Sequence, residues 1–260
     1  MPKVLMMILI AFTHPLLAVT DVDIDKLVNQ IQNKFIINVY IKEIPSSVWP
    51  LDFEKANEGD NEDLYKYLII FEQEFSKYPV SFIRKTRLNG VSFVRSLGYG
   101  GQLRTAIPDY RREVLFFDFM RGNFDQVYQR HVIHHEFYHM IEQEFNQDAY
   151  WKDPKWIGLN KPDVSYGKGG MMMQGNSNAF SFTHPDKGFV NLYSKSAPEE
   201  DKAEVYAGLF IKEEYSKIVQ WMRNDSILEN KVKYMKSFLK SQDDEFHKSY
   251  WSKLPQREIQ

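Results

Sequence analysis

Apolar residues recur along the chain at two spacings, and each spacing predicts a type of secondary structure. Apolar positions three and four residues apart predict helices over 21–34, 61–77 and 124–146, and another that begins near Pro198. Runs of β-branched and aromatic residues predict strands over 35–41, 91–97 and 113–119. The stretch 148–196 is rich in Trp, Tyr, Gly and Asn, which is typical of loops, and short amphipathic helices follow it. This pattern predicts an α+β fold.

The chain shows no sign of separate domains, because it contains no internal repeat and no linker rich in Pro, Gly or Ser. Its 260 residues are enough to bury one sizeable core. We therefore expect a single domain over 21–260. Its N-terminal lobe, about 21–147, would hold a small mixed sheet with helices, and its C-terminal lobe, about 148–260, would be mostly helical.

The first twenty residues have the pattern of a signal peptide. Lys3 precedes an apolar run over 4–12, and small residues at 18–20 precede an acidic segment. The apolar run is too short to span a bilayer, so we expect no stable membrane insertion. We predict a signal peptide at 1–20 and a secreted or periplasmic protein. The alternatives are a first buried strand or helix, or an intracellular effector.

Composition narrows the possible partners and metal ligands. The net charge of −2 gives no electrostatic reason to bind nucleic acid. The absence of cysteine excludes disulfides and thiolate metal sites, and it leaves His and carboxylate side chains as the plausible metal ligands.

The segment His135-Glu136-Phe137-Tyr138-His139 carries the clearest chemistry of the chain, an H-E-x-x-H motif within the predicted helix over 124–146. Residues four apart share one helix face, so His135 and His139 can bind the same ion. Glu136 then lies beside the open coordination position, where a water would bind. The motif predicts a catalytic Zn²⁺ site. The alternative is a core helix with coincidental histidines.

A tetrahedral catalytic zinc needs one further protein ligand. Residues 142–145 offer no third histidine in the spacing H-E-x-x-H-x-x-G-x-x-H, and the next histidine is His184, in a loop. Glu200 and Glu204 fit best, because they lie four apart at the start of a predicted helix, where one could bind zinc and the other could hold a ligand imidazole. Glu199 is a third candidate, although a capping box with Ser196 would occupy it. The alternative is that these acids are solvated charges at a helix start.

The chain resembles a known group through Ile133-His134-His135-Glu136-Phe137-Tyr138-His139, Gly188-Phe189-Val190-Asn191-Leu192-Tyr193 and Glu200-Asp201-Lys202-Ala203-Glu204. It is similar to the gluzincin-type metallopeptidases, above all to a bacterial family of zinc-binding metallopeptidases, and more distantly to the anthrax-lethal-factor-like and Pro-Pro endopeptidases. The resemblance covers roughly residues 114–210. It implies a zincin-like two-lobed fold, with Glu200 as the third zinc ligand, Glu204 as its supporting partner and Tyr193 as a transition-state tyrosine. Lys202 departs from the family, which has an aromatic or aliphatic residue there.

The hypothesis from the sequence is zinc-dependent hydrolysis of a peptide bond in a protein or peptide substrate. Glu136 would take a proton from the zinc-bound water and pass it to the leaving amine. Tyr193, or else the loop residue His184, would stabilise the oxyanion. We assign no role to His131 and His134, which flank the motif, since a fourth protein ligand would close the open position.

Two alternatives remain from the sequence. The chain could be a binding protein that keeps the scaffold without turnover, or a zinc hydrolase that acts on a non-peptide bond such as a cell-wall amide.

The strand residues 115–118, just before the motif helix, could form an edge strand that pairs with extended substrate, or an interior strand of the sheet.

Overall fold

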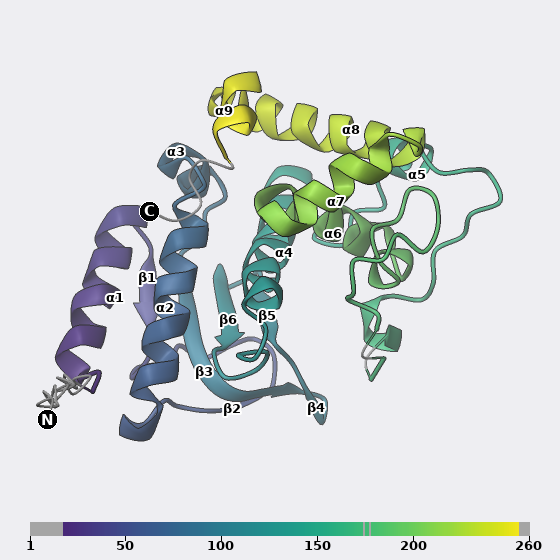
Figure 1. Cartoon of the computed structure of the whole chain (residues 1–260). Helices are drawn as coiled ribbons and strands as arrows, with labels where there is room; N and C mark the ends of the chain where they lie inside the picture. Colours follow the sequence, from purple (N-terminus) through teal and green to yellow (C-terminus); the bar gives the residue numbers. More distant parts are fainter. Residues whose placement is uncertain (1–17, 174, 177, 255–260) are drawn as a thin grey trace, which may run out of the picture.

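The computed structural model describes residues 18–173, 175–176 and 178–254 (Figure 1). Its helices are α1 (Asp21–Phe35), α2 (Asn61–Phe75), α3 (Val80–Lys85), α4 (Gln126–Asn146), α5 (Pro154–Ile157), α6 (Pro198–Phe210), α7 (Lys212–Met222), α8 (Ser226–Gln242) and α9 (Lys248–Lys253). Its strands are β1 (Asn38–Tyr40), β2 (Leu51–Glu54), β3 (Gly90–Tyr99), β4 (Gln102–Leu103), β5 (Ala106–Asp109) and β6 (Val114–Asp118). Short 3₁₀ turns include Gly170–Met173 and Tyr193–Lys195.

The strands form a mixed sheet in the order β1-β3-β6-β5. β1, β3 and β6 are parallel, whereas β5 pairs antiparallel with β6. The short strands β2 and β4 both pair antiparallel with the C-terminal part of β3. Mixed strand directions together with helices on the sheet agree with the predicted α+β class.

Alternate residues of the sheet face two apolar clusters, as the period of two along a strand requires. On one face, Phe93 and Phe117 contact the rings of Tyr67 and Phe71 from α2. This face belongs to the main core, which continues into α4, α6 and α8. The opposite face is covered by a smaller cluster that includes Val94, Leu97, Val114 and Phe116 together with residues of the segment before β3.

The predicted helices over 21–34, 61–77 and 124–146 correspond to α1, α2 and α4, and the helix near residue 198 is α6. The predicted strands over 35–41, 91–97 and 113–119 correspond to β1, β3 and β6. β6 lies inside the sheet between β3 and β5, so the interior alternative for residues 115–118 is the correct one. The edge strand beside the motif helix is β5, which the sequence did not reveal because it is short and contains Pro108.

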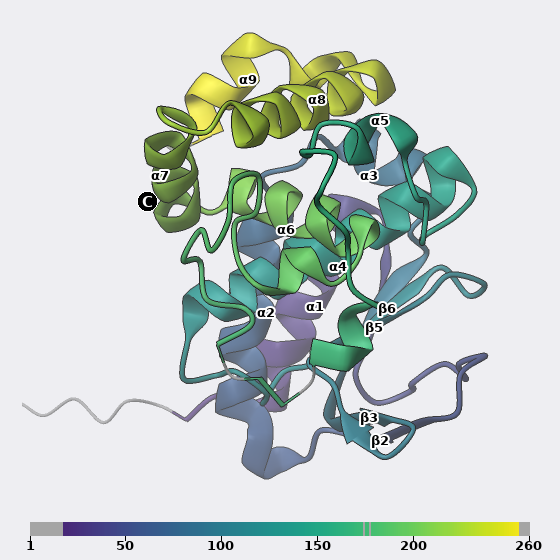
Figure 2. The same ribbon diagram turned by 90° about the vertical axis from the view of Figure 1, so that its right-hand side faces the viewer.

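The pair α4 and α6 links the sheet to the C-terminal helices. Figure 2 shows the two helices crossing in the middle of the molecule, with α8 and α9 at one end and the sheet toward the other. Asp125 begins α4 as its N-cap, and its side chain accepts a hydrogen bond from the backbone N–H of Tyr128. The helix then runs for 21 residues and carries the whole motif without a break.

The predicted signal peptide lies almost entirely outside the described residues, which begin at 18. Among the described helices, none is both long and apolar enough to cross a bilayer. The division into two lobes stays a prediction.

Candidate metal centre

Three potential ligand atoms from α4 and α6 converge at one point. The Nε2 atoms of His135 and His139 lie 3.2 Å apart. Glu200 Oε2 lies 3.1 Å from the first of these nitrogens and 3.5 Å from the second. Among the described residues, Glu200 Oε2 is a buried oxygen without a hydrogen-bond partner. The structure therefore brings together the three residues that were predicted to bind metal.

These separations match the edges of a zinc coordination tetrahedron. Metal–ligand bonds of 2.0–2.1 Å at tetrahedral angles place neighbouring ligand atoms about 3.4 Å apart. The three observed separations of 3.1, 3.2 and 3.5 Å bracket that value. Two neutral imidazoles and one carboxylate are also the donor set of a catalytic zinc, with the fourth position left for solvent. The donor set and its geometry therefore fit Zn²⁺.

Glu200 reaches this point because α6 begins there. Pro198 occupies the first helical turn, and the N-cap is Ala197, which offers no side-chain hydrogen bond. The predicted capping box of Ser196 and Glu199 is therefore wrong. Glu199 instead lines a cavity beside the site, with only 8% of its surface exposed. The helix start supplies backbone N–H groups near the carboxylates, which favours negative charge.

A buried cluster around Asp201 fixes this helix start against the long loop. Asp201 Oδ2 accepts hydrogen bonds from Trp156 Nε1 at 2.7 Å, Tyr166 Oη at 2.6 Å and Lys231 Nζ at 2.6 Å. The three donors come from α5, from the loop after it and from α8. Because Asp201 directly follows Glu200, these contacts hold the backbone of Glu200 in place.

Lys202, the departure from the resembled family, is buried in an ion pair. Its Nζ lies 2.5 Å from Glu142 Oε1 and donates to the carbonyl oxygen of Trp151 at 2.6 Å. Glu142 is on α4, one turn after His139. A charged residue is tolerated here because its charge is paired within the core.

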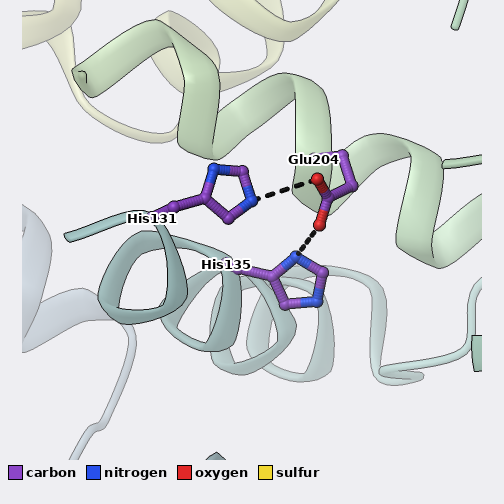
Figure 3. Close-up of side chains that lie close together, drawn as sticks. All are labelled: His131, His135 and Glu204. Carbon is purple, nitrogen blue, oxygen red and sulfur yellow. Dashed lines mark ion pairs between the residues drawn. The ribbon is translucent and has the colours of Figure 1, made fainter. Parts of the chain in front are cut away.

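Glu204 lies on the side of the His135 ring that faces away from Glu200. Its Oε1 is 2.8 Å from His135 Nδ1, the nitrogen on the far side of the ring from Glu200. Its Oε2 is 3.1 Å from His131 Nε2, so one carboxylate contacts two imidazoles (Figure 3). Asn191 Nδ2 also donates to Oε2. A carboxylate in this place sets the orientation of a ligand imidazole.

Glu136 and Tyr193 lie at the border of two cavities. The cavities have volumes of about 360 and 470 Å³. Both are lined by Arg104, Ala106, His135, Glu136 and Tyr193. His139 and Glu200 line only the larger cavity, so the predicted metal position opens into that cavity.

Burial shifts the pKa values of both residues upward. Burial raises the pKa of Glu136 above 4.5, against the opposing effect of the neighbouring histidines, which makes its carboxylate a better proton acceptor. Burial and the nearby Glu200 carboxylate raise the pKa of Tyr193 well above 10. The Tyr193 hydroxyl therefore keeps its proton and can donate a hydrogen bond.

Gly170 packs tightly against two of these residues. A Cβ atom added at Gly170 would lie 2.2 Å from Tyr193 Oη and 2.6 Å from Glu200 Oε1. The backbone of the same segment is attached to the start of α6, because Gly169 N–H donates to the Ser196 carbonyl at 2.9 Å. The long loop thus forms a wall of the site.

The structure does not bring His184 to the site. Its Nε2 lies 2.8 Å from Asp225 Oδ2, and its ring stacks on Trp221. His184 lines neither of the two cavities. Of the two oxyanion donors considered, only Tyr193 lies next to Glu136 and the ligands.

Two residues at the site had no predicted role. His131 has no role in the hypothesis from the sequence, although its position one turn before His135 on the same helix face is a usable signal. Arg104 comes from the turn before β5, and nothing in its sequence context indicated that it would line both cavities.

Comparison with known proteins gives a fold relationship. No model of a protein family matches the chain, and none of the curated proteins matches it either. The chain is similar to a crystal structure of a "putative zinc-binding metallo-peptidase" from Bacteroides caccae, with a TM-score of 0.55 and 16% sequence identity over 90% of each chain. At this identity the likeness shows a shared fold.

Proposed function

We propose that this protein is a zinc-dependent metallopeptidase of the gluzincin type, with a zincin-like fold and with His135, His139 and Glu200 as metal ligands. The observation that carries the proposal is the set of ligand-atom separations of 3.1–3.5 Å, which suits a tetrahedral zinc. The fold shared with the protein from Bacteroides caccae that is described as a "putative zinc-binding metallo-peptidase" supports it. The export predicted from residues 1–20 belongs to the same proposal.

The residues around the metal position divide the reaction between them. A bound zinc supplies Lewis acidity and lowers the pKa of a coordinated water toward about 7. Glu136 accepts the proton of the attacking water and returns it to the leaving amine. Tyr193 donates a hydrogen bond to the oxygen that gains negative charge. Glu204 holds the His135 ring in orientation.

The edge strand β5 offers a place for an extended peptide. Asp118 N–H donates to the Thr105 carbonyl at 2.8 Å, so Thr105 faces β6. Along an antiparallel strand, the backbone N–H and C=O groups of successive residues point alternately toward the neighbouring strand and away from it. The backbone groups of Ala106 and Pro108 therefore point away from β6. The Pro108 carbonyl accepts from Trp49 Nε1 at 3.3 Å, whereas Ala106 lines both cavities. We infer that the backbone of Ala106 pairs with the substrate backbone.

The side chains of the cleft suggest how a peptide would be distributed along it. The larger cavity is lined by several aromatic residues, namely Trp49, Tyr99, Tyr110 and Tyr150. The smaller cavity is lined by Arg121 and, in common with the larger one, by Arg104. An apolar or aromatic substrate side chain suits the larger cavity, since rings pack favourably against one another.

The test combines zinc quantification with cleavage of an unbiased peptide library by the wild type and by Glu136→Gln. We expect one zinc per chain in both proteins, and turnover by the wild type that falls by at least about 10²-fold in the variant, the lower range for loss of a general base. Full activity in Glu136→Gln would exclude Glu136 as the base.

The same experiment separates the two alternatives. Stoichiometric zinc with no cleavage of any peptide or protein would favour a binding protein without turnover. Cleavage of cell-wall fragments but not of peptides would favour an amidase. The site offers an accessible base beside the open position, which a purely structural zinc does not require.

A further inference from the structure

We propose that His131 and Glu214 form, together with Glu204, a buried charged chain that positions the His135 imidazole for metal binding. This inference rests on the proposed metal site, but it assigns roles to two residues that neither the motif nor the fold relationship singles out. His131 acts through Glu204 and is a positioning residue rather than a ligand.

The chain of contacts is continuous from the metal position to α7. His135 Nδ1 lies 2.8 Å from Glu204 Oε1, and Glu204 Oε2 lies 3.1 Å from His131 Nε2 (Figure 3). On the other side of its ring, His131 Nδ1 lies 2.8 Å from Glu214 Oε2. His131, Glu204 and Glu214 are each at least nine-tenths buried. Three helices, α4, α6 and α7, thus contribute one link each beyond the ligand.

The charges of these buried side chains explain why their contacts would hold Glu204 in place. An ionised carboxylate only accepts hydrogen bonds, so a histidine that bonds to two ionised carboxylates carries a proton on each nitrogen. Burial disfavours this charge, but Glu204 and Glu214 outweigh burial and raise the pKa of His131 to about 10. Contacts at 2.8 and 3.1 Å then hold the two oxygens of Glu204 between the His135 and His131 imidazoles.

The same atoms could be read as a second metal site, since His131, His135 and Glu204 also form a cluster of suitable donors. That site would have to use Nδ1 of His135 while Nε2 serves the first site. One imidazole bridging two cations must lose both ring protons, whereas a single bound ion leaves Nδ1–H free to face Glu204. The contacts to Glu204 thus fit a positioning role.

The test measures zinc affinity by competition with a chromogenic chelator, so it requires no substrate. We expect His131→Gln to weaken zinc binding by about 10- to 100-fold, the range for loss of a supporting group. Glu214→Gln keeps the side-chain shape and should weaken binding in the same direction but less. The double variant of His131→Gln and Glu204→Gln should lose less zinc affinity than the product of the losses in the two single variants, because both changes interrupt the same series of contacts.

His134 provides the matched control on the same helix. It is fully buried, and its Nε2 lies 2.6 Å from Glu74 Oε2, but it faces α2 rather than the metal position. His134→Gln therefore removes a comparable buried pair without touching Glu204. We expect it to lower the melting temperature while zinc affinity stays within about twofold of the wild type.

Three results would overturn the inference. Equal losses of zinc affinity in His131→Gln and His134→Gln would show a general effect of stability. Unchanged zinc affinity in both His131→Gln and Glu214→Gln would show that these buried contacts have no role in metal binding. Two zinc ions per wild-type chain and one in His131→Gln would assign a second metal site. A wild type that binds zinc tightly but cleaves nothing would refute the peptidase function and leave this inference standing.

Discussion

Replacing Gly170 by alanine tests whether the loop wall sets the geometry of the site. The backbone at Gly170 is not in the left-handed region, so alanine can adopt it without strain, and the effect comes from the added Cβ alone. That atom would lie 2.2 Å from Tyr193 Oη and 2.6 Å from Glu200 Oε1. Carbon and oxygen normally stay about 3.4 Å or more apart, so the hydroxyl must retreat by roughly 1 Å and the carboxylate by slightly less.

A displacement of that size is large for a catalytic group. Misplacement by about 1 Å can cost on the order of 10²-fold in rate, which corresponds to about 2.7 kcal/mol of transition-state stabilisation. We therefore expect Gly170→Ala to lower kcat/KM on a cleaved library peptide by roughly 10²-fold. Zinc affinity should also fall, because one of the displaced atoms belongs to a ligand carboxylate.

Gly98→Ala is the matched control, since it is the same change at another ordinary backbone position. A Cβ there would meet its nearest atom, the Gln102 carbonyl oxygen, at 3.5 Å, which is normal contact. We expect Gly98→Ala to keep wild-type zinc affinity and turnover. If Gly170→Ala also keeps both, the loop yields instead of the site, and the reasoning about the wall is refuted.

Three further experiments probe the proposed ligands and the buried charges. Glu200→Ala should lose more bound metal than Glu204→Ala when both purified proteins are analysed by atomic absorption, and the reverse order would exchange their roles. Lys202→Leu should lower the free energy of unfolding by about 3–5 kcal/mol, since it leaves Glu142 buried without its cation, and Glu142→Leu added to it should restore most of the loss in denaturant titrations. An unaffected single variant would contradict this. Burial raises the pKa of Glu142 from 4.5 to about 7, so the folded chain binds that proton more tightly than the unfolded chain. The stability that Glu142 contributes is therefore complete below the pKa of its carboxyl in the unfolded chain, and it is lost as the pH rises through the pKa in the folded chain. Glu142→Gln should remove this part of the dependence of the unfolding free energy on pH. An unchanged dependence on pH would refute the argument.

Much of the secondary structure and part of the site could be predicted from the sequence, because the responsible interactions are local. α1, α2, α4 and α6 follow from apolar spacing along a few turns, and β3 and β6 follow from β-branched and aromatic runs. The H-E-x-x-H spacing already places His135 and His139 on one helix face, with Glu136 next to His135, since that geometry depends only on the helical repeat.

Tertiary structure decided everything that depends on distant segments. The sequence allowed Glu199, Glu200 and Glu204 as partners of the motif. Only the crossing of α4 and α6 places Glu200 next to Nε2 of both motif histidines, and Glu204 next to Nδ1 of His135. Strand order made β5 the edge strand and β6 an interior one, because hydrogen bonding between strands is not encoded by the pattern within either. His184, available by sequence, is held by Asp225 away from the cleft. Local periodicity determines what each segment becomes, whereas the packing of segments far apart in the chain determines which side chains meet.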